Sequence, residues 1–250
     1  MLTYLSNDQG GAMETKIPLP PGIVDRLIEK QIKEWQVNSK KRYKKPIRPV
    51  ITISRLPGAG GTALAKELAE KLKIGFFDHE IVEAIARNAK VSERVIETLD
   101  EEDRSILDDW IAALDSRRHL WRDEYLSHLR NVIGTIGAHG YAVILGRGAG
   151  FILPEKVCLR VLVVAPLETR IRNVVENSGM STEEAGEKVM KTESGRVAFI
   201  KKYFHADMKD PGNYDLVINT ENVNIETSVK IVSEIYNTRE WYNYSGRGAA

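Results

Sequence analysis

Cysteine is almost missing from this chain, because Cys158 is the only one among 250 residues. A single cysteine can form neither an internal disulfide bond nor a cysteine-based metal cluster, so both kinds of cross-link are excluded. Cys158 lies within the apolar run from Val157 to Val164. We therefore interpret its side chain as a small apolar group in a buried strand rather than as a reactive thiol.

An excess of charge of one sign is also missing, since 36 lysines and arginines stand against 35 aspartates and glutamates, for a net charge of +1. This balance does not favour a nucleic acid or a membrane surface as the partner. No apolar run is long enough to cross a bilayer, and Met1 to Asp8 lack the basic start and apolar run of a signal peptide. The sequence predicts a cytoplasmic protein and leaves the number of subunits open, a homo-oligomer included.

The chain does have the composition of an ordinary globular protein, with 42% hydrophobic and 28% charged residues. A chain of this length is expected to form one α/β domain with appendages. We assign residues 1–47 to an amino-terminal appendage that holds a helix over 22–36. The basic run Lys40–Lys45 then acts as a solvated linker or as a phosphate- or RNA-binding patch. Residues 48–240 form the main domain, and 241–250 form a tail.

Short apolar runs alternate with helical patterns from Pro49 onward. The predicted strands span residues 50–54, 75–78, 141–145, 159–164 and 213–219. The predicted helices span residues 60–72, 79–88, 166–177 and 225–237. Such strands, separated by helices, indicate a parallel sheet that helices cover on both faces. We expect Val50–Ser54 at the centre of the sheet, between Tyr141–Leu145 and Leu159–Val164.

The most informative segment is the Gly-rich connection ISRLPGAGGT over residues 53–62, between the first strand and the next helix. Glycines let successive backbone N–H groups turn toward an anion, and the helix N-terminus adds partial positive charge. The Thr62 hydroxyl is placed to bind a phosphate or its Mg²⁺. A Gly-rich turn without a ligand is the alternative interpretation. The expected phosphate-binding residues are Gly58, Ala59, Gly60, Gly61 and Thr62.

This segment departs from the phosphate-loop pattern G-x-x-x-x-G-K-[ST] at two positions. Arg55 stands at the first glycine, and Gly61 stands at the lysine. The lysine normally brings positive charge to the phosphates. Because Arg55 lies at the entrance of the loop, we hypothesise that its side chain supplies this charge instead.

Together with four later segments, the loop resembles the cytidylate-kinase-like proteins, relatives of bacterial cytidylate kinase among the P-loop nucleoside monophosphate kinases. The resemblance covers about residues 49–237, and its other carriers are Phe77–Ile81, Val143–Gly148, Val163–Arg170 and Tyr214–Thr220. It implies a P-loop NTPase-type three-layer α/β fold with a five-stranded parallel sheet. It also implies a helical acceptor insertion at about 79–140, an arginine-rich lid at about 178–205, and ATP and Mg²⁺ as cofactors.

The acceptor side of the resemblance rests on two residues. Arg147 follows an apolar strand, at the sheet edge where ligands bind in open α/β folds, and the matching arginine of the family contacts the monophosphate. Asp78, at the end of a shorter strand, is expected to face the acceptor nucleotide or to hold metal-bound water. Where bacterial cytidylate kinase has two acids around this arginine motif, the chain has Leu145 and Gly148.

Phosphoryl transfer chiefly requires positive charge around the moving group. We assign this role to Arg170 and Arg172, which follow Pro166, and to Arg196, in a segment that resembles the lid pattern of the family. We expect two helices joined near Ser194-Gly195 to form a hinged lid that brings these arginines above the loop. Including the loop entrance, the candidate catalytic residues are Arg55, Arg170, Arg172 and Arg196.

The leading hypothesis is ATP-dependent phosphorylation of a nucleoside monophosphate, CMP or dCMP by family resemblance. The missing lysine and acids favour a second hypothesis, a non-catalytic nucleotide sensor. A kinase for another small acceptor is the third, because Val91–Gly140 departs from any acceptor pattern. In that segment, Trp110 and Trp121 flank the basic residues 117–119.

Overall fold

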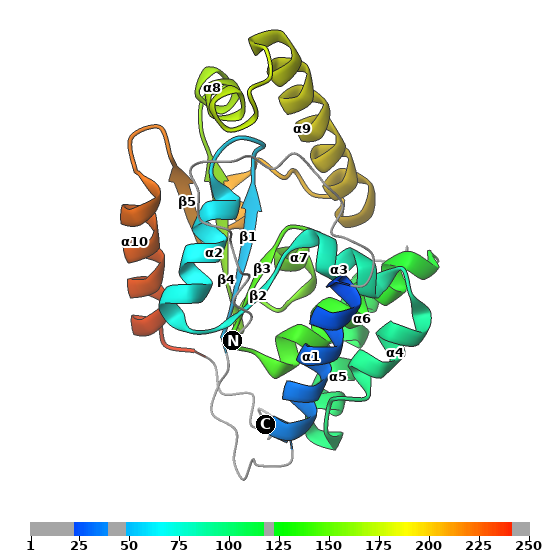
Figure 1. Cartoon of the computed structure of the whole chain (residues 1–250). Helices are drawn as coiled ribbons and strands as arrows, with labels where there is room; N and C mark the ends of the chain where they lie inside the picture. The colour runs from blue at the N-terminus through cyan, green and yellow to red at the C-terminus, as the bar shows by residue number, and fades with distance from the viewer. Residues whose placement is uncertain (1–22, 40–48, 118–122, 242–250) are drawn as a thin grey trace.

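The computed structural model describes residues 23–39, 49–117 and 123–241 (Figure 1). The predicted basic run Lys40–Lys45, Trp121 with its neighbours Arg118 and His119, and most of the predicted tail lie outside the described residues. No helix within the described ranges has both the length and the apolar character needed to cross a bilayer.

A five-stranded parallel sheet organises the chain, in the order β2-β3-β1-β4-β5. Its strands are β1 (Val50–Arg55), β2 (Gly75–Phe77), β3 (Ala142–Leu145), β4 (Cys158–Val164) and β5 (Leu216–Asn219). Val50 pairs with Ala142 on one side and with Cys158 on the other. The prediction of a central, buried first strand between the third and fourth strands is confirmed.

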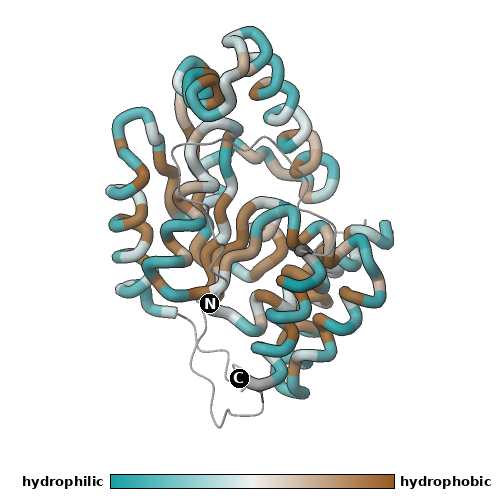
Figure 2. Tube along the Cα trace, viewed as in Figure 1, coloured by the Kyte–Doolittle hydropathy of each residue, from teal (hydrophilic) through white to brown (hydrophobic). Residues whose placement is uncertain are grey.

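Helices cover the sheet in the expected layers. On one face α2 (Gly61–Leu72) packs against α10 (Ile225–Thr238), whereas the short α7 (Ala149–Ile152) contacts β1 and β4 from the other face (Figure 1). Figure 2 shows apolar residues gathered along the strands. The parallel α/β fold with a loop at the carboxyl end of β1 is therefore present as predicted.

A group of helices lies beside the sheet, and in the sequence it comes after β2 and before β3. Its members are α3 (His79–Ala86), α4 (Ala89–Ile96), α5 (Glu101–Arg117) and α6 (Glu124–His139). The amino-terminal helix α1 (Ile23–Ser39) packs against this group (Figure 1). Trp35 of α1 stacks on Phe77 and His139, with ring centroids 5.7 and 4.3 Å away. These contacts tie α1 to the end of β2 and to α6.

Two helices rise above the carboxyl edge of the sheet (Figure 1): α8 (Leu167–Ser178) and α9 (Thr182–Phe204). The sequence Ser181-Thr182-Glu183-Glu184 has the pattern of a capping box, and the structure contains one: the Ser181 hydroxyl accepts from the N–H of Glu184, and the Glu184 carboxylate accepts from the N–H of Ser181. The hinge expected near Ser194-Gly195 is wrong, since α9 runs unbroken through both residues. Side-chain anchors on either side of Gly195, described below, outweigh the roughly 1 kcal/mol that a glycine costs a helix.

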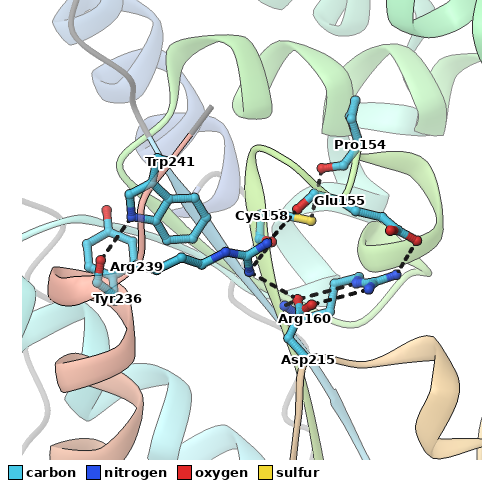
Figure 3. A network of polar contacts seen from close by, with 8 residues as sticks. All are labelled: Pro154, Glu155, Cys158, Arg160, Asp215, Tyr236, Arg239 and Trp241. Atoms are coloured by element: carbon cyan, nitrogen blue, oxygen red, sulfur yellow. Dashed lines mark hydrogen bonds and ion pairs between the residues drawn. The ribbon is translucent and has the colours of Figure 1, made fainter. Parts of the chain in front are cut away.

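The opposite pole of the sheet carries a polar network (Figure 3). Asp215 accepts hydrogen bonds from the N–H and the guanidinium of Arg160 and pairs with Arg239, which also donates to the Cys158 carbonyl. Burial raises the pKa of the Cys158 thiol to about 12, and this thiol donates to the Pro154 carbonyl. The interpretation of Cys158 as a buried strand residue is confirmed.

Candidate functional site

The Gly-rich loop between β1 and α2 has its carbonyl groups turned outward. Four of these oxygens accept hydrogen bonds from side chains distant in sequence, at 2.9 to 3.3 Å. The pairs are Arg55 with Arg196, Pro57 with Arg170, Gly58 with Asn173, and Ala59 with Thr220. Each anchor comes from the carboxyl side of the sheet, from α8, α9 or the residue after β5. The loop is therefore held from outside.

The N–H groups of the same loop are its second feature. Gly58 and Gly60 have φ values of 79° and 75°, which glycine adopts without a steric penalty. Among the described residues, no protein carbonyl accepts from the N–H of Gly58, Gly60, Gly61 or Thr62. The N–H of Ala59, in contrast, donates to the Leu56 carbonyl over 3.2 Å in a tight turn, so the prediction that Ala59 offers its N–H to a phosphate is wrong. The other four donors stand at the positive end of α2, so the loop has the form of an open anion cradle and is not collapsed on itself.

The fit of a metal ion to this cradle rests on the Thr62 hydroxyl, which lies half-buried in the first turn of α2. The described ranges hold no group of three or more His, Cys, Asp or Glu side chains that would form a metal site of their own. Mg²⁺ usually keeps several waters and binds through few protein oxygens and substrate phosphates. A magnesium ion carried by a nucleotide, with Thr62 as a protein ligand, fits these residues.

The side chain of Arg55 runs from the loop entrance toward the start of α3. It is buried, and its Nη2 donates to Nδ1 of His79, at the start of α3, over 3.3 Å. Along its way it passes Gly61 of α2 and Gly146, which follows β3. The guanidinium thus lies between the phosphate loop and the first helix of the β2–β3 insertion.

Arg147 occupies a backbone turn in which three residues in a row have positive φ: Gly146 at 82°, Arg147 at 52° and Gly148 at 69°. Its guanidinium forms an ion pair with Glu83 of α3. Burial lowers the pKa of Arg147, and the nearby Glu80 carboxylate opposes this shift. A partly buried arginine at the carboxyl end of β3, held toward the insertion, is suited to bind an anionic acceptor.

Asp78 is the N-cap of α3. Its Oδ1 accepts from the N–H groups of Glu80 and Ile81, both at 3.0 Å. The carboxylate therefore fixes the start of the helix that carries Glu83, next to His79, which contacts Arg55. Contact of Asp78 with an acceptor nucleotide stays a prediction.

The three lid arginines have different surroundings. Arg170 is buried, with Nε on the Ala165 carbonyl, Nη1 near the Pro57 carbonyl and an ion pair to Glu193 at 2.8 Å. Arg196 reaches the loop from α9. Arg172 donates to the Thr169 hydroxyl at 3.3 Å instead. The structure thus brings Arg170 and Arg196 to the loop, whereas Arg172 makes no hydrogen bond to the loop among the described residues.

Sequence reasoning missed three residues that shape this site. Asn173 and Thr220 hold loop carbonyls, and Glu193 joins Arg170 of α8 to Lys209 beyond α9. One signal existed for Thr220, because it follows the last strand at the edge where ligands bind. Asn173 lies one helical turn after Arg170, so it shares the helix face that meets the loop.

The chain is similar in sequence to cytidylate kinases and similar in fold to a solved structure. The cytidylate kinase of Methanocaldococcus jannaschii is 27% identical over 192 residues, which cover 74% of this chain and 95% of that protein. The cytidylate kinase of Aeropyrum pernix is 29% identical, covering 73% and 95%. A crystal structure of an uncharacterised protein from Eubacterium ventriosum shares the fold, with a TM-score of 0.58 at 20% identity, covering 77% of this chain and all of the other.

The sequence profile of one family matches more than half of the chain. The match spans residues 50–222 and so includes the phosphate loop, the helical insertion, Arg147 and all three lid arginines. The β2-β3-β1-β4-β5 sheet and the outward-bonded loop lie in the same span. The chain belongs to the cytidylate kinase-like family.

Proposed function

We propose that this protein transfers the γ-phosphoryl group of ATP to a nucleoside monophosphate, with CMP or dCMP as the preferred acceptor. The observation that carries the proposal is the loop whose carbonyls are bonded outward and four of whose N–H groups are left for an anion. Family membership and relatives named as cytidylate kinases support the reaction and the acceptor class.

The donor nucleotide belongs on the loop. Backbone N–H groups of Gly58, Gly60, Gly61 and Thr62 and the positive end of α2 stabilise its phosphates, and Thr62 is the protein ligand of its Mg²⁺. That ion neutralises charge on the β- and γ-phosphates when bound. Arg170 keeps the loop open from outside, since its guanidinium bonds the Pro57 carbonyl and Glu193.

The acceptor belongs between β3 and the helical insertion, with its phosphate on Arg147. In the free protein Glu83 neutralises this arginine. A phosphate dianion is the stronger partner for a guanidinium and displaces the carboxylate, because it offers more negative charge and more acceptor oxygens. Asp78 fixes α3, which carries this carboxylate.

Transfer is tested by ADP release from ATP against CMP, dCMP, UMP, dTMP, AMP, GMP and small alcohols. We expect CMP or dCMP to give the highest kcat/KM, at least about tenfold above the next acceptor, since a base-recognising hydrogen bond is worth about that much. ATP binding without stimulation by any acceptor would leave the non-catalytic sensor. Stimulation by an alcohol alone would assign a kinase for a different acceptor.

Charge reversal in the lid separates an enzyme from a sensor. Arg196→Glu places a carboxylate beside the loop and should reduce kcat by about 100-fold or more, because the cation acts on the transition state, while ATP affinity changes only modestly. Arg196→Gln keeps a donor for the Arg55 carbonyl and is the matched control for loop shape. Equal kcat in wild type and Arg196→Glu would contradict a catalytic lid.

A further inference from the structure

Gly61 occupies the position of the usual phosphate-loop lysine, and the structure shows why a side chain is absent there. A Cβ atom on Gly61 would stand 2.5 Å from Cβ of Arg55 and 2.9 Å from its Cγ. Real Cβ atoms do not approach other carbons so closely, and both Arg55 atoms belong to the stiff, buried start of that side chain. A lysine at position 61 therefore excludes arginine, and any other residue with a Cβ atom, at position 55.

A second glycine lines the far end of the same path. A Cβ on Gly146 would overlap Nη1 of Arg55, and the positive φ of Gly146 also disfavours any other residue. Two glycines, one at the start of α2 and one directly after β3, thus leave the space that the arginine fills. His79 accepts from the tip of the guanidinium and fixes its direction.

We propose that Arg55 is the catalytic cation of this site. In phosphate loops that follow the usual pattern, a lysine at the position of Gly61 supplies this charge, whereas here Arg55 supplies it from the opposite end of the loop. The inference rests on the proposed phosphoryl transfer. It assigns His79 as a positioning residue that holds the guanidinium between donor loop and acceptor insertion. Gly61 and Gly146 are required because they make room for Arg55.

The chemistry needs no proton from Arg55. An oxygen of the acceptor monophosphate forms a bond to the γ-phosphorus, the bond from this phosphorus to the β,γ-bridging oxygen breaks, and ADP leaves with that electron pair. The guanidinium stays charged throughout and donates hydrogen bonds to non-bridging oxygens of the group in transit. Its fixed, buried position means that little reorganisation is needed when charge moves.

The exclusion predicts a pattern in four variants. Arg55→Gly should lower kcat by about 100- to 1000-fold, the usual loss for one donor to a transition-state oxygen. Gly61→Lys should also lose activity and melt earlier, because its Cβ collides with Cβ and Cγ of Arg55. The double variant Arg55→Gly/Gly61→Lys should regain at least about tenfold over Arg55→Gly, since glycine at position 55 also removes the Cβ atom and lysine then enters the freed space. Arg55→Gly/Gly61→Ala, without a cation, should regain nothing.

A chemical rescue separates loss of charge from loss of fold. Millimolar guanidinium or methylguanidinium added to Arg55→Ala should raise kcat, because the truncated side chain leaves a buried space of matching shape. The exposed variant Arg104→Ala should show neither the loss nor the rescue. A kcat for Arg55→Ala within about threefold of wild type would overturn the inference, and so would an equal recovery in both double variants.

A binding arm keeps this inference distinct from the proposed function. Arg55→Ala should reduce the preference for a non-hydrolysable ATP analogue over ADP by about tenfold, measured by calorimetry. If wild type does not turn over but Arg55→Ala still loses the preference for the ATP analogue, then Arg55 binds the γ-phosphate and the kinase proposal fails. If wild type turns over while Arg55→Ala changes neither kcat nor this preference, the Arg55 assignment alone fails.

Discussion

At the scale of single residues, Arg147 shows a local conflict between conformation and charge. It is held at a φ of 52° between two glycines, where a non-glycine residue costs about 1–2 kcal/mol. Glycine would suit this backbone better, yet the chain has arginine there, paired with a carboxylate of the insertion. Backbone strain of this kind is typical of functional sites, so the strain supports the assignment of Arg147 to the acceptor.

This conflict gives a prediction for two variants of Arg147. Arg147→Gly should unfold with a free energy about 1 kcal/mol larger than that of Arg147→Ala, because only glycine relieves the left-handed backbone. Both variants lack the guanidinium, so both should raise KM for the monophosphate by about tenfold or more. Urea unfolding and steady-state kinetics check the two halves separately. Equal stability of the two variants would contradict the strain argument.

At the scale of the elements, α9 is one continuous helix rather than two helices joined by a hinge. Arg170 and Lys209 hold Glu193 on one side of Gly195, and the Arg55 carbonyl holds Arg196 on the other. Phe204 packs against Phe151 of α7, with ring centroids 5.4 Å apart, and this contact extends the attachment to the end of the helix. Gly179 and His205, which have left-handed backbones, lie outside this attached stretch, before and directly after α9.

A substitution at Gly195 tests this view. Gly195 is exposed, and a Cβ placed there meets nothing within 4 Å. Gly195→Ala should stabilise the protein by about 0.5–1 kcal/mol, because alanine favours the helix interior, and kcat should stay unchanged. Ser194→Ala, its exposed neighbour, is the control for a change of composition alone. A clear fall of kcat in Gly195→Ala would restore the hinge.

The elements also show what the sequence predicts well. All five strands and the capping box follow from local patterns, since each depends on residues within a few positions of one another. The continuity of α9 could not be predicted, because contacts with residues far along the chain decide it. The roles of Asn173 and Thr220 were hidden for the same reason: their partners are backbone carbonyls, which every residue has.

Asp78 is the contrasting case among the site residues. Aspartate directly before a helix is a preferred N-cap, so its role was available from local sequence. The prediction instead placed it toward the acceptor, whereas its Oδ1 caps α3. Arg55 was predicted at the loop entrance for its charge alone. A side chain at position 61 would collide with Arg55, and this collision can be seen only in the three-dimensional structure.

At the scale of the whole molecule, two anionic anchors stand at opposite ends of the sheet. Asp215 holds Arg160 and Arg239 at the amino ends of the strands, and Glu193 holds Arg170 and Lys209 beyond the carboxyl ends. Burial alone would raise the pKa of each carboxyl, but hydrogen bonds from these cations lower both pKa values below the ordinary range. The fold is therefore tied to their ionised forms.

The sign of the resulting pH dependence follows from these shifts. Because the unfolded chain binds protons at a higher pH than the folded one, both carboxylates stabilise the fold above about pH 4, and this contribution is lost as the pH falls through the folded pKa values. Asp215→Asn should lower the free energy of unfolding at neutral pH, and the difference from wild type should shrink below about pH 4. Urea unfolding over a pH series measures it. A constant difference would contradict the ion-pair account.

The outward-bonded loop has a consequence for synthesis of the chain. Its four anchors lie 113, 115, 141 and 161 residues after the carbonyls that they hold. The ribosome synthesises the loop early and the anchors late. The loop therefore lacks its full set of hydrogen bonds until Thr220 has been synthesised. A nascent chain halted before that residue would contain every glycine of the loop and lack the full set of bonds that keeps its amides open to a nucleotide.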